Sequence, residues 1–151
     1  MVGLRPLPLL EQCPAGSLGL GIDIRIKDLD YAKLRGLLAD WRQVSPDYYG
    51  DFYPLTPWNR SRDTWIAWQF DRPEAGEGIV QVFRRDASVY ESARFKLHGL
   101  EPGTRYRVTR VGEATRAKPQ SGAALMNPGL LVNIAEPPGV AVLRYQRSDA
   151  F

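Results

Sequence analysis

Acidic side chains are the first candidates for chemistry in this 151-residue chain, because two carboxyl groups held close together act as general acid and base. The acidic residues nearest to predicted helices and strands are Asp23, Asp28, Asp30, Asp51, Asp71, Glu74 and Glu77. Most of them fall in expected caps, loops and turns, where no scaffold converges two of them. Glu74 and Glu77 lie in one polar loop and are expected to be solubilising charges. The sequence therefore predicts no catalytic residues.

Cysteine and histidine are each present once, as Cys13 and His98. Because the chain has one thiol, it cannot form an internal disulfide or hold a metal cluster with several thiolates. Because it has one imidazole, a metal site built from several histidines is excluded, and a catalytic triad has only one candidate histidine. The glycine-rich stretch Leu18–Ile24 is not followed by the Gly-Lys-Ser/Thr of a phosphate-binding loop, and it lacks the dinucleotide-binding spacing. We therefore predict no cofactor and no metal, and we expect His98, which precedes a turn, on the surface.

Three tryptophans could stack on sugar rings, as in carbohydrate-binding modules, although burial in a core is the commoner fate of a large aromatic side chain. Trp65 and Trp68 lie on opposite faces of one predicted strand, so the two rings cannot form one platform. Trp58 lies in a predicted loop and is the better candidate for a substrate-side contact. A sugar site there would also draw on the nearby residues Tyr48, Tyr49 and Tyr53.

Composition excludes two classes of partner. The net charge of +3 is small, and the basic residues are spread along the chain without a basic block, so we expect no nucleic acid partner. No run of about 18 apolar residues exists, so we expect no membrane-spanning segment. The first ten residues lack the long apolar core and small-residue cleavage site of a signal peptide. A cytoplasmic location is the default expectation.

Two apolar runs, Thr64–Asp71 and Gly78–Arg85, predict a β-hairpin around the polar loop Arg72–Glu77. Counting in twos assigns the faces of each strand. The first strand places Trp65, Ala67 and Gln69 on one face and Ile66, Trp68 and Phe70 on the other, and the second separates Ile79, Gln81 and Phe83 from Val80, Val82 and Arg84. Because neither face is cleanly polar, the hairpin should be central in a sandwich or covered by another domain.

Four further period-two runs follow the hairpin. They are Ser92–Leu97, Thr104–Val111, Leu130–Ile134 and Val140–Gln146. Short strands separated by turn signals predict an antiparallel β-sandwich. The spacing of Leu100–Val108 is also typical of a tyrosine corner, in which the Tyr106 hydroxyl would anchor a loop. The segment Ala114–Gly122 is expected to be a loose connection, and Tyr48–Trp58 a rigid aromatic connector.

The N-terminal third has a different pattern. Residues 1–17 are irregular, and Leu18–Ile24 reads as a short buried strand. A helix is predicted from about residue 28 to 44, with Asp28 as its N-cap and Pro46 ending it. The apolar stripe of this helix consists of Leu34, Leu37, Leu38 and Trp41. One βα unit cannot bury its own apolar face, so residues 1–47 should need a neighbour, and residues 48–151 should form the sandwich.

Three segments carry a resemblance to a known family. Gly50–Thr56, Asp63–Asp71 and Gly76–Arg85 resemble the C-terminal region of glycoside hydrolase family 36 α-galactosidases, the melibiases. The resemblance continues in the same order downstream, through Leu97–Pro102, Ser121–Gly122, Leu125–Met126 and Gly129–Leu130. Upstream, Leu18–Asp23 and the helix ending in Trp41–Arg42 are similar to the last βα unit of that family's catalytic barrel. The similarity spans roughly residues 18–145.

The resemblance implies a non-catalytic accessory domain whose partner is a (β/α)₈ barrel, in the same chain or a separate one. Such a barrel needs about 250 residues, and the family's catalytic aspartates lie upstream of anything present here. The chain would then be a fragment, a truncated reading frame or one gene of a split enzyme, and its exposed apolar faces could self-associate. Asp23, at the end of the predicted barrel strand, would be a substrate-side residue. The alternatives are a free-standing carbohydrate-binding sandwich and a fibronectin-III-like interaction domain.

Overall fold

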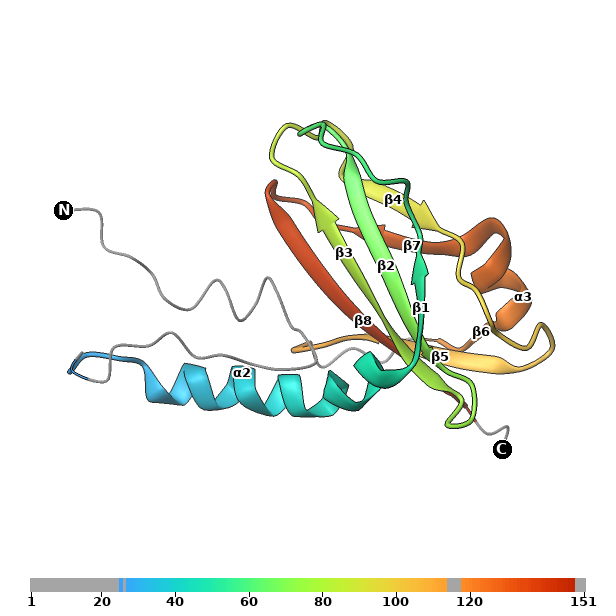
Figure 1. Cartoon of the computed structure of the whole chain (residues 1–151), viewed down its shortest axis with the longest axis horizontal. Coiled ribbons are helices and arrows are strands. Elements are labelled where there is room, and N and C mark those ends of the chain that lie inside the picture. The colour runs from blue at the N-terminus through green and yellow to red at the C-terminus, as the bar shows by residue number, and fades with distance from the viewer. Residues whose placement is uncertain (1–24, 26, 114–117, 149–151) are drawn as a thin grey trace.

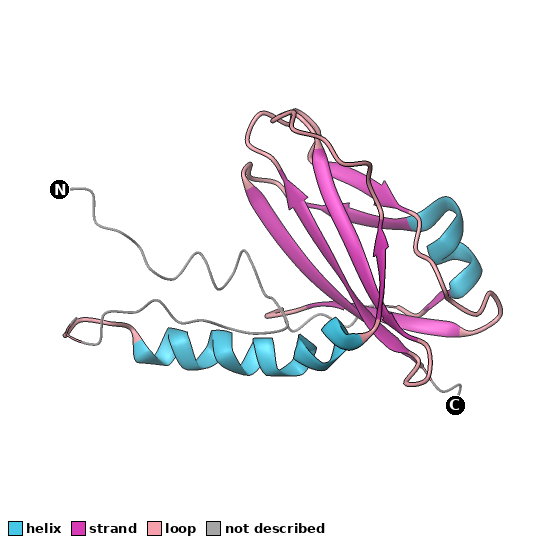
Figure 2. Ribbon diagram, in the orientation of Figure 1, coloured by secondary structure: helices cyan, strands magenta, loops and turns pink. Residues whose placement is uncertain are grey.

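Two antiparallel sheets of unequal size face one another and form the body of the protein (Figures 1 and 2). The computed structural model describes residues 25, 27–113 and 118–148. Its strands are β1 (Asp51–Pro54), β2 (Trp65–Arg72), β3 (Glu77–Arg84), β4 (Ser92–Phe95), β5 (Arg105–Arg110), β6 (Gln120–Ser121), β7 (Leu130–Asn133) and β8 (Gly139–Arg147). The large sheet has the order β1-β2-β3-β8-β5-β6, and the small sheet pairs β4 with β7. The predicted antiparallel sandwich is confirmed.

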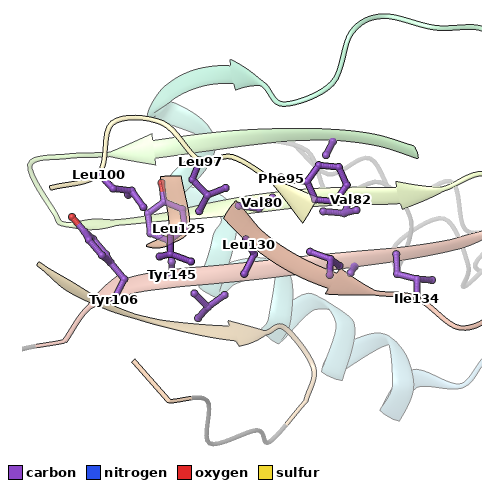
Figure 3. Packing of buried hydrophobic residues seen from close by; sticks show 14 residues of the cluster. Val80, Val82, Phe95, Leu97, Leu100, Tyr106, Leu125, Leu130, Ile134 and Tyr145 are labelled. Carbon is purple, nitrogen blue, oxygen red and sulfur yellow. The ribbon is translucent and has the colours of Figure 1, made fainter. Parts of the chain in front are cut away.

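The core lies between the two sheets and follows the strand alternation. In the large sheet, Val82 pairs with Ala67 of β2 and with Ala141 of β8, and all three side chains are buried. The small sheet contributes Phe95, Leu130 and Val132, the loop after β4 adds Leu97 and Leu100, and the helical turn before β7 adds Leu125. Figure 3 shows these side chains meeting between the layers. Burial of a continuous apolar layer is the main favourable contribution to the stability of the sandwich.

The β2–β3 hairpin has the predicted faces, and its strands match the predicted bounds to within one residue at each end. Ala67 and Gln69 point into the core, whereas Trp68 lies on the outer face opposite Gln81. The hairpin is central, because β3 pairs with β8 and β2 with the edge strand β1. The two faces of the hairpin are therefore apolar for different reasons. One face packs into the core between the sheets, and the other is an outer surface that is partly covered.

The predicted helix is present as α2 (Tyr31–Val44), but its cap differs from the prediction. The carboxylate of Asp30, not of Asp28, accepts a hydrogen bond of 2.8 Å from the backbone N–H of Lys33. Both residues are aspartates two positions apart, so composition alone did not separate them. Pro46 does end the α-helix, yet the chain continues as the 3-10 helix η1 (Ser45–Tyr49), because proline fits the first turn of a new helix. The predicted strand Leu18–Ile24 lies outside the described residues.

Two segments that were expected to be irregular contain regular structure. Part of the predicted connector forms strand β1, which pairs along β2 from Asp51 opposite Asp71 to Pro54 opposite Trp68. The end of the predicted loose connection forms β6, followed by the short helix α3 (Gly122–Ala124) and the π-helical turn η2 (Leu125–Gly129). Strands of two and four residues are too short to show a period-two pattern, so only pairing with a neighbour reveals them.

The tyrosine corner is present. The Tyr106 hydroxyl accepts a hydrogen bond of 3.1 Å from the backbone N–H of Glu101, and its ring is buried against Tyr145. We expect Tyr106→Phe to lower the free energy of unfolding by about 1 kcal/mol, because one neutral hydrogen bond is lost and the ring is retained. Urea denaturation followed by tryptophan fluorescence measures this change. An unchanged midpoint would show that water replaces the hydroxyl at Glu101 without cost.

Candidate functional site

A buried group of charges joins the helical segment to the large sheet. Asp47, in η1, is completely buried. One of its carboxylate oxygens lies 3.8 Å from the Arg72 guanidinium at the end of β2, and the other lies 3.7 Å from the Arg144 guanidinium of β8. Glu77 of β3 accepts the shorter hydrogen bonds from the same two arginines, at 3.2 and 2.7 Å. We call Asp47, Arg72, Glu77 and Arg144 the junction cluster.

The Asp47 carboxylate is held in an environment that disfavours its charge. Burial is the largest cause, and the negative charge of Glu77 adds to it, so the pKa of Asp47 is raised from 3.8 to about 6 although Arg144 and Arg72 act in the opposite direction. Within the described part of the chain, neither of its carboxylate oxygens accepts a hydrogen bond. The Asp47 carboxylate is completely buried and flanked by two arginines, so it has no access to a substrate. Asp47 and its neighbour Glu77 therefore have a structural role.

The second buried carboxylate, Asp71, belongs to a hydrogen-bond network in the interior. The Tyr145 hydroxyl donates to Asp71 at 2.5 Å and accepts from the Gln69 amide at 2.9 Å. Gln69 also exchanges two hydrogen bonds of 2.8 Å with the backbone N–H and C=O of His98. Burial raises the pKa of Asp71, while the bond from Tyr145 opposes that rise. The network ties β2 and β8 to the loop that follows β4, and within it the Asp71 carboxylate accepts a hydrogen bond from Tyr145.

The outer face of β1–β3 is rich in aromatic side chains. Phe70 packs against the rings of Tyr48 and Phe52, at centroid distances of 5.0 and 5.3 Å, and Trp68 packs against Phe83 at 5.1 Å. Helix α2 lies over a different part of the sheet. Together with β8, β5 and the turn after β5, it lines a cavity of about 370 Å³. The outer aromatic face, defined by Phe52, Ile66, Trp68, Phe70 and Phe83, therefore extends beyond the strands that α2 lines.

Of the two predicted site residues, the structure describes only Trp58. Asp23 lies outside the described residues, so its predicted role stays a prediction. Trp58 is in the loop between β1 and β2 and is 85% exposed, as expected for a residue available to a ligand. The tyrosines weighed with it lie elsewhere, since Tyr48 packs on Phe70 and Tyr53 stacks on the His98 ring at 5.2 Å. His98 is exposed, in agreement with its predicted surface position.

Sequence reasoning did not identify the junction cluster. Its members are far apart in the sequence, and Arg72 and Glu77 had been assigned to the polar loop of the hairpin on local grounds. The expectation that Glu77 is a solubilising loop charge is wrong, because Glu77 lies in β3 and pairs with two arginines. One signal was available: Arg144 lies between Leu143 and Tyr145 in a strand whose other face is core, so it had to face outwards towards the helical segment. The need of a partly buried arginine for an acidic partner could then have directed attention to Asp47.

No group of three or more histidine, cysteine, aspartate and glutamate side chains in residues 25, 27–113 and 118–148 is arranged to hold a metal ion. Among the helices of the same residues, none has the length and apolar character needed to cross a membrane.

Comparisons with known proteins agree with this architecture. The family model "Glycosyl hydrolase family 36 C-terminal domain" matches residues 65–143, just over half of the chain. The fold is similar to that of the GH36 α-galactosidase AgaB from Geobacillus stearothermophilus, with a TM-score of 0.65, 20% identity and coverage of 82% of this chain and 17% of that chain. It is also similar to that of the α-galactosidase from Lactobacillus brevis, with a TM-score of 0.64, 17% identity and coverage of 86% and 18%. No match was found among curated protein sequences.

Proposed function

Because this chain belongs to the glycosyl hydrolase family 36 C-terminal domain family, we propose that it is a non-catalytic accessory domain that stabilises a (β/α)₈ catalytic barrel. Helix α2 would be the last helix of that barrel, and the residues from 48 onward would form the sandwich beside it. The barrel would be supplied in the same chain or by a separate one. The chain spans less than one fifth of the length of the solved α-galactosidases that it resembles.

The outer aromatic face is the observation that carries the proposal. Phe52 is 56% exposed although it lies in a strand of the large sheet, and the neighbouring rings of Phe70 and Trp68 are only half-buried. Apolar side chains on the non-core face of a central hairpin gain free energy when a second surface covers them. The junction cluster supports the same arrangement, because it fixes the end of α2 against the sheet from which this face extends.

Hydrolysis of a chromogenic α-galactoside by the purified chain tests the non-catalytic role. We expect no release of the chromophore above the uncatalysed rate. Both buried carboxylates of the described residues are engaged by arginine or tyrosine, and neither is accessible to a sugar. Turnover that persists through repeated purification would contradict the proposal, because it would require an accessible pair of carboxyl groups.

Solution mass tests the apolar face. We expect the isolated chain to self-associate, and we expect Phe52→Asp to weaken this association by roughly tenfold, because a charge would be placed within the outer aromatic face. Leu131→Asp is the matched control, since Leu131 is 53% exposed but lies in β7 of the small sheet, whereas Phe52 is 56% exposed. Sedimentation equilibrium of the three proteins makes the comparison. Equal weakening by both substitutions would indicate non-specific aggregation.

A further inference from the structure

The apolar stripe of α2 is buried at a point that the strands do not reach. The N-terminal turns of α2 extend past the sheets, whereas its C-terminal half faces β8 and the turn after β5 across the cavity described above (Figure 2). Leu34 lies in the projecting turns and is only 8% exposed. Within the described ranges, the core between the sheets does not include Leu34. Its burial therefore requires a cover other than the sandwich core.

The cavity of about 370 Å³ continues this stripe towards the sheet. Its apolar lining comes from α2 on one side and from β8 and the turn after β5 on the other, namely Leu37, Trp41, Val44, Val111, Val140 and Val142. Its charged lining residues are Asp40, Arg110 and Glu113, of which Arg110 and Glu113 pair with one another at 3.3 Å. We call Leu34 together with this apolar lining the helix groove. A surface that is apolar along two walls suits an apolar occupant.

Residues 18–24, which lie outside the described residues, have the sequence pattern of such an occupant. Leu18, Leu20, Ile22 and Ile24 occupy every second position, and two glycines and an aspartate lie between them. An extended backbone would place all four apolar side chains on one face. By comparison, residues 114–117 offer no large apolar side chain, and residues 1–17 are interrupted by three prolines.

The length of this stretch and its connection to α2 fit the groove. Extended backbone over residues 18–24 spans about 23 Å, and the 14 residues of α2 span about 21 Å. Residues 25–30 join the two and can reach about 20 Å, which is enough to reverse direction across a helix about 10 Å wide. Alternate strand positions advance by about 6.6 Å. Helix positions three or four apart advance by about 5 to 6 Å, so the two apolar rows stay close over several repeats.

We propose that residues 18–24 lie antiparallel to α2 in the helix groove, as a strap formed by the same chain. The apolar face of the strap covers Leu34 at one end and fills the cavity beside Val44 at the other. This contact goes beyond the accessory role and does not depend on a barrel. It makes the chain cover its own helix, so that the outer aromatic face remains the surface available to a second protein.

Disulfide trapping in the full chain tests the position of the strap. Every variant carries Cys13→Ser, which removes the native thiol, and Ile22→Cys, which places a thiol on the strap. The second thiol is introduced by Leu34→Cys or Leu37→Cys in the stripe, or by Arg35→Cys as the matched control, because Arg35 is exposed on the other side of α2. A disulfide requires Cα atoms within about 7 Å. We expect at least one stripe pair to form an intramolecular disulfide roughly tenfold faster than the Arg35 pair.

Two results of the trapping experiment would overturn the proposal. Equal rates for the stripe pairs and the Arg35 pair would show that residues 18–24 do not rest on the stripe. Disulfides that link two chains, visible as a dimer on a non-reducing gel, would make a second copy the occupant of the groove.

Hydrogen exchange of the full chain, followed by mass spectrometry, tests the effect of the strap on the helix. We expect the double substitution Leu20→Asp and Ile22→Asp to accelerate exchange of the α2 amides roughly tenfold, because the uncovered helix opens more easily. The amides of β2 and β3 should exchange at the rate of the unmodified protein, which shows that the sandwich is retained. Leu9→Asp with Leu10→Asp is the matched control, since it places the same charges in the proline-containing stretch before the strap.

Unchanged exchange of α2 in the Leu20 and Ile22 variant would overturn the proposal, as would equal acceleration by the Leu9 and Leu10 control. Protection of α2 that is lost on dilution would assign the cover to a second copy. Neither experiment depends on a catalytic barrel, and an active α-galactosidase would contradict only the accessory role.

Discussion

Replacement of Tyr145 by phenylalanine is expected to lower the free energy of unfolding by about 3 kcal/mol at neutral pH. The Tyr145 hydroxyl is the donor that reaches the buried Asp71 carboxylate, at 2.5 Å, and the side chains of both residues are inaccessible to water. Phenylalanine keeps the ring in the core but leaves a buried charge without this donor, and an unpaired buried charge costs more than an unpaired neutral group. Gln69 would also lose its bond to the hydroxyl, although it keeps its bonds to His98.

The pH dependence of this defect identifies its cause. The bond from Tyr145 lowers the pKa of Asp71, whereas burial raises it, so the substitution leaves burial unopposed. Asp71 in the variant should therefore take up a proton at a higher pH than in the unmodified protein. The loss should shrink towards about 1 kcal/mol in acid, where only a neutral hydrogen bond is missing. Urea titrations between pH 4 and 8 measure this loss of unfolding free energy, with Tyr106→Phe as a control. A loss that does not depend on pH would assign the effect to packing.

Local sequence patterns were sufficient for the strands that build the core. The β2–β3 hairpin, β5 and β8 each have one face that must be apolar, and this requirement leaves a period-two pattern that can be counted in the sequence. The tyrosine corner was predictable for a similar reason, because Tyr106 and Glu101 are close in sequence and the turn between them fixes their contact. These features depend on neighbours along the chain, so the sequence displays them directly.

Long-range polar contacts were not predictable in the same way. Adjacent residues of a strand face opposite sides of the sheet, so Arg84 and Arg85 are expected to point in opposite directions. The structure separates them as expected, but each binds carbonyl oxygens of a different loop. The partners of these guanidinium groups are backbone atoms 50 and 26 residues away, and backbone atoms carry no sequence signal. The exposed position of Trp58, by contrast, followed from the surrounding turn residues.

Acidification from pH 7 to pH 4 is expected to stabilise the unmodified protein by about 2 kcal/mol through Asp47 alone. The pKa of Asp47 is about 6 in the folded protein and 3.8 without its environment, so the folded state binds more protons between these values. The stabilisation is therefore complete below pH 3.8 and is lost as the pH rises through 6. At neutral pH the ionised carboxylate is retained in the junction cluster at a cost, because burial outweighs the attraction of Arg144 and Arg72.

Asp47→Asn isolates this contribution, since asparagine has the same shape and does not titrate. The unfolding free energy of the unmodified protein, relative to the variant, should rise steadily as the pH falls from 7 to 4 in urea titrations. Asp86→Asn is the control, and its difference in unfolding free energy should change in the opposite direction with pH. Arg62 lowers the pKa of Asp86, so any stabilisation by that surface ion pair weakens in acid. If the Asp47→Asn difference instead falls with decreasing pH, the two arginines dominate the site and attraction, not burial, determines the charge of Asp47. A rise would establish that burial, and not the attraction of the two arginines, determines the pKa of Asp47 in the segment that links α2 to the sandwich.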